Sequence, residues 1–170
     1  NSESANKDYH PELKLSKKIF ASEVLSECVC NADLIFIATP SSIIENVIDR
    51  IKPHIKGDVV LISCTKGLIN DPTRTITDYI KDQLIGKTAF ERLGVLSGPN
   101  LAREIADEKV AGSVIASKSQ HSKDLVISAL ESKIFKLYSS NDIKGVEYAG
   151  ALKNIYALGC GIGYELDIGE

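Results

Sequence analysis

The sequence predicts an α/β fold, in which a mostly parallel sheet carries helices on its faces. Short runs of almost uninterrupted apolar residues alternate along the chain with longer segments of helical periodicity. Continuous apolar runs are typical of strands that are buried on both faces, as the strands of parallel sheets are. The regular alternation of the two patterns is typical of α/β proteins. A long, nearly uncharged helical segment follows from about residue 143 onward.

Five segments are expected to form the strands of this sheet. Each is short and rich in apolar residues, and the first of them ends at Pro40. The expected strands cover residues 33–39, 59–64, 92–96, 112–116 and 134–138.

Helices are expected in the segments that connect these strands. Ser41 or Ser42 can cap the first helix with a side-chain oxygen. The second is amphipathic, and its inward-facing residues are Ile76, Tyr79, Ile80 and Leu84. The expected helices cover residues 43–51, 73–85, 101–106, 122–130 and the segment from about 143. Residues 1–18 are polar and are expected to be loop-like.

Three loops follow apolar strands and are the candidates for ligand binding, because α/β sheets bind ligands at the carboxyl ends of their strands. They cover residues 39–42, 64–67 and 97–100. Lys66 emerges at the end of a strand, although a lysine at such a position is more often a solvated loop residue. The Ser-Gly-Pro-Asn loop at residues 97–100 precedes a helix, and its exposed amides suit a phosphate or a cofactor amide. The alternative is a tight turn with a helix cap.

The last helical segment carries one lysine, Lys153, in a stretch that is otherwise nearly uncharged. A buried ammonium group is costly unless a partner pairs with it. Lys153 is therefore either held by a structural carboxylate or used chemically, and the residues alone leave both open. The residues on its helical face are small, which leaves room for a ligand or a second backbone segment. These residues are Gly145, Ala149, Ala157 and Gly161.

Glycine is unusually frequent in this last segment. Each glycine inside a helix costs about 0.5–1 kcal/mol relative to alanine, so we expect either packing reasons for these residues or a helix break near Gly159. The Gly-Cys-Gly-Ile-Gly run is not a dinucleotide-binding loop, because Tyr164 occupies the third glycine position and no strand precedes it. A membrane span is also not expected, because Lys153 and Asn154 lie at its centre.

Composition excludes several classes of protein. The 170 residues are 44% hydrophobic and 25% charged, as in ordinary globular domains. A net charge of −3 gives no electrostatic footprint for nucleic acid or a membrane surface. Cys28, Cys30, Cys64 and Cys160 lack CxxC spacing and nearby histidines, so neither a metal site nor a disulfide framework is expected. We expect reduced thiols in a cytoplasmic protein. The chain contains no methionine, and we expect an internal fragment of a longer protein.

Four segments in order resemble the NAD-dependent glycerol-3-phosphate dehydrogenases. They read ADLIFIATPSSII at 32–44, LISCTKGL at 61–68, VLSGPNLAREIA at 95–106 and GVEYAGALKNIYALGCGIGYELDIGE at 145–170. The SGPN loop is nearer to the bacterial-type enzymes. The resemblance implies a Rossmann-like, mostly parallel sheet at residues 1–142, a partial dinucleotide-binding domain that lacks its N-terminal βαβ unit. Residues 143–170 would then be the first helix of an all-helical C-terminal domain.

The resemblance also implies roles for individual residues. Lys153 would be the general acid/base, and Lys66 would bind dihydroxyacetone phosphate or glycerol 3-phosphate. Gly98 and Asn100 match the substrate-side loop, and Asn154 would line the same pocket. Many relatives carry Ser or Thr at the position of Asn100, which puts the role of its side chain in doubt. We expect Lys153 to be more desolvated than Lys66 and therefore to be the proton carrier.

On the cofactor side, the resemblance places Pro40, Ile43 and Ala102 against the dinucleotide, which would be NAD, with NADP possible. It implies a cytoplasmic homodimer in full-length form, with a small-molecule substrate and neither nucleic acid nor a membrane span. No GxGxxG loop occurs in the chain, so we expect these 170 residues to turn over little substrate alone.

Two alternatives stay open. The first is another dehydrogenase of the 6-phosphogluconate or ketopantoate type, which also places a lysine on a helix after the nucleotide domain. The second is a non-catalytic dinucleotide-binding domain, in which Lys153 would be a structural ion-pair partner.

Overall fold

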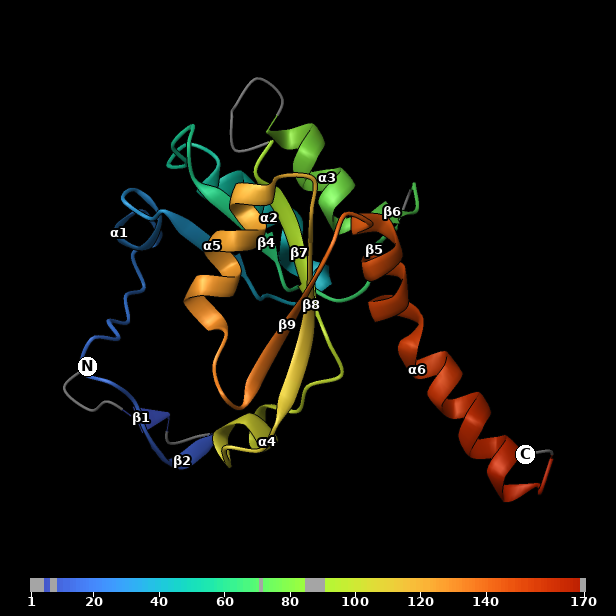
Figure 1. The fold of residues 1–170 in the computed structure, drawn as a ribbon. Coiled ribbons are helices and arrows are strands. Elements are labelled where there is room, and N and C mark those ends of the chain that lie inside the picture. Colours follow the sequence, from blue (N-terminus) through green and yellow to red (C-terminus); the bar gives the residue numbers. More distant parts are fainter. Residues whose placement is uncertain (1–4, 7–8, 71, 85–90, 169–170) are drawn as a thin grey trace.

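The computed structural model describes residues 5–6, 9–70, 72–84 and 91–168. Within these residues the centre of the protein is a five-stranded sheet with the order β3-β4-β7-β8-β9 (Figure 1). The strands are β3 (Leu34–Ile37), β4 (Val60–Ser63), β7 (Leu93–Ser97), β8 (Ala111–Ser117) and β9 (Phe135–Ser140). In this sheet, as far as the described residues show it, β7 and β8 pair antiparallel and the other neighbours pair parallel. The prediction of a mostly parallel α/β sheet is confirmed.

The register of β3, β4 and β7 brings their carboxyl ends to one edge of the sheet. Ile37 at the end of β3 pairs with Ser63 at the end of β4, and Ser63 pairs with Val95 in β7. The residues that follow these three strands therefore emerge side by side. These are the three loops that the sequence analysis singled out for ligand binding.

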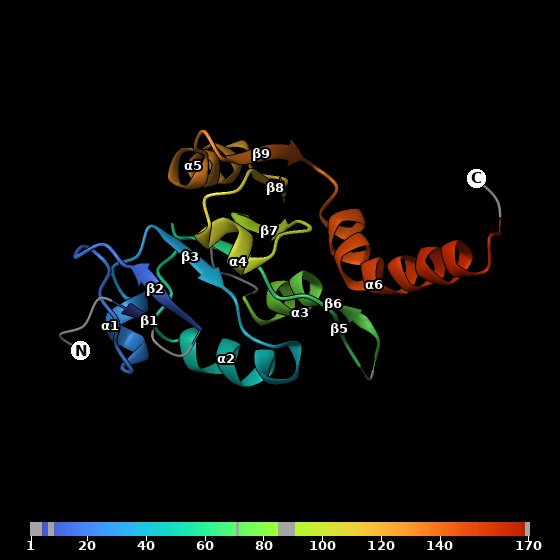
Figure 2. The ribbon, with the colours of Figure 1, turned by 90° about the horizontal axis from the view of Figure 1, so that it is seen from below.

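Helices cover both faces of the sheet, as Figure 2 shows. The helices α2 (Ile44–Ile51) and α3 (Ile76–Gln83) lie on one face, and α5 (Gln120–Leu130) lies on the other. The shorter helices are α1 (Leu25–Val29), η1 (Ser41–Ile43) and α4 (Ala102–Ala106). Two small antiparallel hairpins pair β1 (Ala5–Asn6) with β2 (His10–Lys14) and β5 (Leu68–Ile69) with β6 (Arg74–Thr75).

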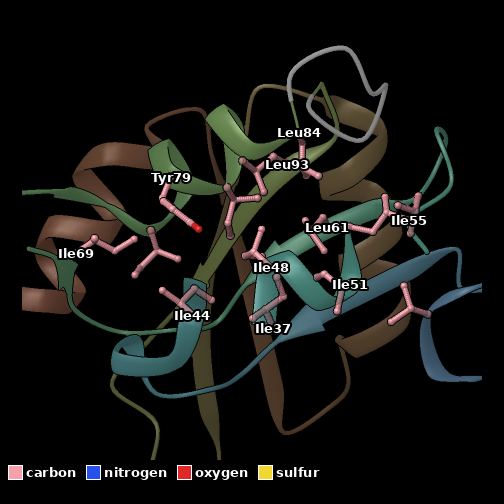
Figure 3. Close-up of a cluster of buried hydrophobic side chains, with 14 residues drawn as sticks. Ile37, Ile44, Ile48, Ile51, Ile55, Leu61, Ile69, Tyr79, Leu84 and Leu93 are labelled. Atoms are coloured by element: carbon pink, nitrogen blue, oxygen red, sulfur yellow. The ribbon is translucent and has the colours of Figure 1, made fainter. Parts of the chain in front are cut away.

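The two faces of the sheet have separate hydrophobic cores, because successive strand residues point to opposite sides. Leu61 of β4 packs with Ile44 and Ile48 of α2 in the larger core, which Figure 3 shows. Val60 packs with Val126 of α5 in the smaller core. All five side chains are fully buried. Burial of each such side chain contributes about 1.5–3 kcal/mol, so β4 is anchored from both sides.

Three helices begin at residues whose side chains cap them. Thr75 caps α3, Ser119 caps α5 and Asp142 caps α6 (Ile143–Glu165), each by accepting a hydrogen bond from a backbone N–H in the first turn. Such a cap satisfies one of the amide groups that have no partner within the helix. The cap at Asp142 explains Gly145, because a Cβ there would collide with the Asp142 carboxylate.

Several element boundaries differ from the predictions. The helix expected at 43–51 begins earlier as η1, and the helix expected at 73–85 begins at Ile76, because Thr75 is its extended cap; residue 85 lies outside the described residues. The prediction that residues 1–18 are loop-like is wrong for the β1–β2 hairpin. The helix α1 was not predicted at all, since its five residues show too little periodicity.

The last helix, α6, is continuous through its glycines and does not break near Gly159. Its first half packs against β7, β8 and β6, and its second half extends beyond the sheet (Figure 1). The expected packing reason exists at Gly150, where a Cβ would lie 2.7 Å from Ser97 Oγ. It does not exist at Gly159 and Gly161, where no described atom lies within 4 Å of a Cβ.

Candidate active site

The loops after β3 and β4 are joined at the carboxyl edge of the sheet. The backbone N–H of Cys64 donates to the carbonyl of Ile37 at 2.8 Å, and the Thr65 hydroxyl donates to the same carbonyl at 3.4 Å. Gly67 has a φ of +116°, which side-chain-bearing residues rarely adopt, and a Cβ there would lie 3.1 Å from Ser41 Oγ. Glycine at this position lets the Thr-Lys-Gly loop turn close against η1.

Lys66 connects this loop to the one that follows β7. Its side chain is exposed, and its ammonium group donates to the carbonyl oxygen of Gly98 at 3.4 Å. The second and third loops therefore meet at Lys66.

Gly98 lies where the backbone approaches the start of β8. A Cβ there would lie 2.6 Å from the carbonyl oxygen of Gly112 and 2.5 Å from Ser113 Oγ, so no larger residue fits without a backbone shift. The Asn100 amide donates to Ser113 Oγ at 2.5 Å. The Asn100 side chain therefore bonds to Ser113 of the same chain, and this hydrogen bond ties the loop to β8.

A cavity of about 240 Å³ lies between this loop and α6. Lys66 and Lys153, which are distant in sequence, both line it, and so does Gly98. The helix contributes one face, since Val146, Gly150 and Lys153 follow one another at helical spacing. Asn100 and Asn154 are not among the described residues that line this cavity. The structure therefore brings Lys66, Gly98 and Lys153 together but leaves the two asparagines at the margin.

The expectation that Lys153 is buried among small residues is wrong in this structure. Lys153 is exposed, as are Ala149, Ala157 and Gly161 on the same face. The physical reason is that the first half of α6 packs on the sheet, whereas from Lys153 onward every residue of this helix except Gly163 is exposed. Lys66 is exposed as well, so the expected contrast in desolvation between the two lysines is not present.

One buried carboxylate on α6 contacts α3, and the sequence did not reveal it in advance. Glu147 is 5% exposed, and its Oε1 accepts the backbone N–H of Thr77 at 2.9 Å. Its Oε2 accepts the Thr77 hydroxyl. Burial raises the pKa of the Glu147 carboxyl, and the hydrogen bonds from Thr77 oppose this rise. The available signal was an acidic residue next to the apolar stretch that begins at Tyr148.

The residues expected on the cofactor side lie exposed around the same edge of the sheet. Pro40 precedes η1, Ile43 ends it, and Ala102 begins α4 after β7. The buried Oγ1 of Thr39 at the end of β3 has no hydrogen-bond partner among the described residues. An accessible apolar edge with an unsatisfied polar atom, at the carboxyl ends of parallel strands, fits a dinucleotide.

The cysteines of the chain are free thiols. His54 lies beside Cys30, with its Nδ1 3.9 Å from the sulfur, although the two are not neighbours in sequence. Within the described ranges, no three metal-ligating side chains are grouped together. No helix in the same part of the chain is both long and apolar enough to cross a bilayer.

Comparison with protein families matches nearly the whole chain. A family model for the N-terminus of NAD-dependent glycerol-3-phosphate dehydrogenase matches residues 1–123, and the model for the C-terminus of the same family matches residues 142–170. The glycerol-3-phosphate dehydrogenase [NAD(P)+] of Alcanivorax borkumensis is 36% identical over the entire chain, which covers 48% of that protein. The corresponding protein of Acinetobacter baumannii strain SDF is 41% identical over 97% of the chain and 45% of its own length.

Solved structures give the same result. The glycerol-3-phosphate dehydrogenase of Plasmodium falciparum superposes with a TM-score of 0.86 at 30% identity, over 98% of this chain and 46% of that one. The enzyme of Coxiella burnetii superposes with a TM-score of 0.84 at 28% identity, over 99% of this chain and 50% of that one. A ketopantoate reductase of Ralstonia eutropha, at 14% identity and a TM-score of 0.55, shares the fold alone.

The chain spans about half the length of the relatives that it matches. Within that span the family models cover both the sheet and the start of α6, and the fold agrees with the solved members throughout. The chain belongs to the NAD-dependent glycerol-3-phosphate dehydrogenase family.

Proposed function

We propose that these residues form the substrate edge of an NAD(P)-dependent glycerol-3-phosphate dehydrogenase, which interconverts dihydroxyacetone phosphate and glycerol 3-phosphate. The observation that carries the proposal is that Lys66 and Lys153 line one cavity, together with Gly98. The relatives named for this activity supply the substrate and the cofactor class.

In this proposal Lys153 moves the proton and Lys66 holds the substrate. During reduction, the Lys153 ammonium donates a proton to the carbonyl oxygen of dihydroxyacetone phosphate as that oxygen becomes a hydroxyl. During oxidation, the neutral amine takes the proton back from the hydroxyl. Lys66 offers the substrate oxygens the N–H donors that do not go to the Gly98 carbonyl. Bound NAD(H) supplies the hydride donor or acceptor for the carbinol carbon.

Two cations at one cavity suit a substrate that carries a phosphate. Both side chains are exposed and can move toward a ligand, and no carboxylate within the described residues forms an ion pair with either. Charge-assisted hydrogen bonds to phosphate are stronger than neutral ones. The small lining residues on α6 leave the approach to the Lys153 amine open.

Replacement of Lys153 by alanine in the complete gene product tests the catalytic assignment. The variant is expected to fold and to bind NADH, and to lose turnover by about 10²–10⁴-fold, the usual contribution of a general acid/base. NADH binding is followed by its fluorescence, and turnover is followed by NADH oxidation with dihydroxyacetone phosphate. Unchanged turnover would remove Lys153 from the mechanism.

The same substitution separates this proposal from a non-catalytic dinucleotide-binding domain. In that alternative Lys153 is a structural ion-pair partner, and its loss would destabilise the fold strongly. The absence of a carboxylate partner among the residues of the described ranges argues for the enzyme. A screen of the complete gene product with ketopantoate and 6-phosphogluconate tests the remaining alternative, another dehydrogenase of similar fold.

We also propose that residues 1–142 belong to a dinucleotide-binding domain and that residues 143–170 begin a helical substrate domain. The start of α6 at Ile143 and the extension of its second half beyond the sheet support this division. We further infer a cytoplasmic homodimer. The free cysteines support a reducing compartment, and the exposed apolar residues of α6 support a covered surface in the assembled protein. Light scattering of the complete gene product tests the dimer.

A further inference from the structure

We propose that Glu147 is a positioning residue, which fixes the rotation of α6 so that Lys153 faces Lys66 across the cavity. This inference rests on the proposed function, because it assigns Glu147 a role in catalysis that acts through Lys153. Three features of α6 support it: the contact between Glu147 and Thr77, the packing of Gly150, and the spacing of these residues along the helix.

The contact between Glu147 and Thr77 is buried and has two parts. Thr77 lies in the first turn of α3, where backbone N–H groups have no acceptor within the helix. One carboxylate oxygen of Glu147 accepts this N–H at 2.9 Å, and the other accepts the hydroxyl. The positive end of the α3 dipole also favours a negative charge here. A two-point contact of this kind holds both the position and the rotation of the helix that carries it.

Glu147 and Lys153 lie on the same helix, so the contact that fixes the rotation of α6 also fixes the direction of Lys153. Residues 147 and 153 are six positions apart, so they point to different sides of the helix, one toward α3 and the other toward the cavity. A rotation of α6 by about 20° would move a long side chain by about 2 Å, given a helix radius with side chains of 5–6 Å. A misplacement of about 1 Å can lower a rate by about 10²-fold. Small rotations of α6 therefore matter for a proton carrier.

Two other contacts join α6 to the same domain. Gly150 lies against Ser97, where a Cβ would be only 2.7 Å from the hydroxyl oxygen, so the helix sits close to the end of β7. Lys144 forms an ion pair with Asp78 at 2.9 Å on the surface, between the same two helices that Glu147 joins. Exposed ion pairs of this kind contribute little. Lys144 therefore provides a matched control for Glu147.

The experiment compares Glu147→Ala, Glu147→Gln, Thr77→Val and the control Lys144→Gln in the complete gene product. Turnover per folded molecule, KM for dihydroxyacetone phosphate, the dissociation constant of NADH and the unfolding midpoint are measured for each. We expect Glu147→Ala to lower kcat by about 10–100-fold, with unchanged NADH affinity. Glu147→Gln and Thr77→Val keep part of the contact. Their kcat should lie between that of Glu147→Ala and that of the control Lys144→Gln, which should equal the wild-type value.

A role in stability alone predicts a different pattern. Glu147→Ala would then lower the unfolding midpoint while each folded molecule kept its kcat, and that result would overturn the proposal. If Glu147→Ala does not fold, Glu147→Gln and Thr77→Val replace it. A lower kcat per folded molecule in these variants supports the proposal, and a lower unfolding midpoint with unchanged kcat overturns it.

A second measurement does not depend on activity. A short amine-reactive cross-linker should join Lys66 to Lys153 in the wild-type protein and in Lys144→Gln, and the yield should fall in Glu147→Gln. Equal yields in all three proteins would overturn the proposal whatever the kinetics show. Retained activity in Lys153→Ala together with a reduced cross-link in Glu147→Gln would instead refute the catalytic assignment and leave the positioning of Lys153 standing.

Discussion

At the scale of single residues, the carboxyl end of β4 contains a thiol that should be nearly inert. Burial raises the pKa of Cys64 to about 11. At pH 8 its thiolate fraction is then on the order of 10⁻³, against about a quarter for a cysteine with a pKa near 8.5. Cys28 and Cys160 are exposed. We expect a disulfide reagent at pH 8 to label these two rapidly and Cys64 slowly.

Variants of this chain assign the fast phase of labelling. Cys160→Ser should remove one rapidly reacting thiol, whereas Cys64→Ser should leave the fast amplitude unchanged. A smaller fast amplitude in Cys64→Ser would show that the thiol is accessible and ionised, contrary to its partial burial against the smaller core.

The buried carboxylate of Glu147 should make stability depend on pH in a defined direction. Its pKa is raised in the folded state by burial, while its pKa in the unfolded chain is about 4.3. Between these two values the folded protein binds more protons than the unfolded chain. At pH values above the raised pKa, this carboxyl should leave the free energy of unfolding unchanged. As the pH falls from the raised pKa toward about 4.3, the free energy of unfolding should rise.

Urea unfolding of the wild type and of Glu147→Gln at several pH values between 7 and 4.3 measures this effect. The difference between the two proteins should shift in favour of the wild type as the pH falls. A shift in favour of the variant would mean that the carboxylate is stabilised in its charged form and that the hydrogen bonds from Thr77 outweigh its burial.

The positions of residues at strand ends could be predicted from the sequence. The burial of individual side chains could not, because it depends on which other segments pack over them. Lys66 and Gly98 were correctly expected at one edge, because parallel strands bring their carboxyl ends together. The burial of Lys153 was wrong, because small neighbours on a helix permit a packed partner but do not supply one. Glu147 was missed since its partner, Thr77, lies far away in sequence.

At the scale of elements, α6 contains glycines in two different environments, and alanine substitutions should separate them. No described atom lies within 4 Å of a Cβ at Gly159, so Gly159→Ala should stabilise this chain by about 0.5–1 kcal/mol through helix propensity. Gly150→Ala should gain less, because its methyl group must displace the Ser97 hydroxyl.

A Ser97→Ala background provides the control for this pair. The Cβ of Ser97 lies 3.8 Å from the new methyl group, an ordinary contact, so Gly150→Ala should recover its gain once the hydroxyl is removed. The two substitutions should therefore be non-additive in urea unfolding. Strict additivity would show that α6 does not press on the end of β7.

The elements themselves were predictable in proportion to their burial. The strand β4 follows from a continuous apolar run, since all four of its residues are buried between the two cores. The strand β3 shows the same pattern, although Phe36 on it is exposed. The β1–β2 hairpin and α1 were not predictable, because short elements carry too few residues to show a period. The antiparallel direction of β8 could not be predicted either, because the connection through α4 sets the direction of this strand and its amino-acid composition does not.

At the scale of the whole molecule, the sheet and α6 form two sides of one cavity. The sheet edge contributes Lys66 and Gly98 on rigid strand ends, and α6 contributes Lys153 from a helix that is fixed in its first half and extends free in its second. The order of segments along the sequence was enough to predict this pairing through the family resemblance. The exposed state of the site was not predictable, because it depends on which residues cover it.

The same arrangement predicts that these 170 residues are a poor enzyme by themselves. Lys153 is exposed to water in this chain, the residues expected to contact the dinucleotide are exposed as well, and the sequence contains no GxGxxG loop to hold a pyrophosphate. We expect the chain to oxidise NADH with dihydroxyacetone phosphate at less than about 1% of the rate of the complete gene product, since proton transfer by a misplaced or solvated group loses about 10²-fold or more. Both proteins are assayed at equal concentration, and circular dichroism confirms that the chain is folded. A rate near that of the complete gene product would mean that the sheet edge and the first half of α6 already hold cofactor and substrate in reacting geometry.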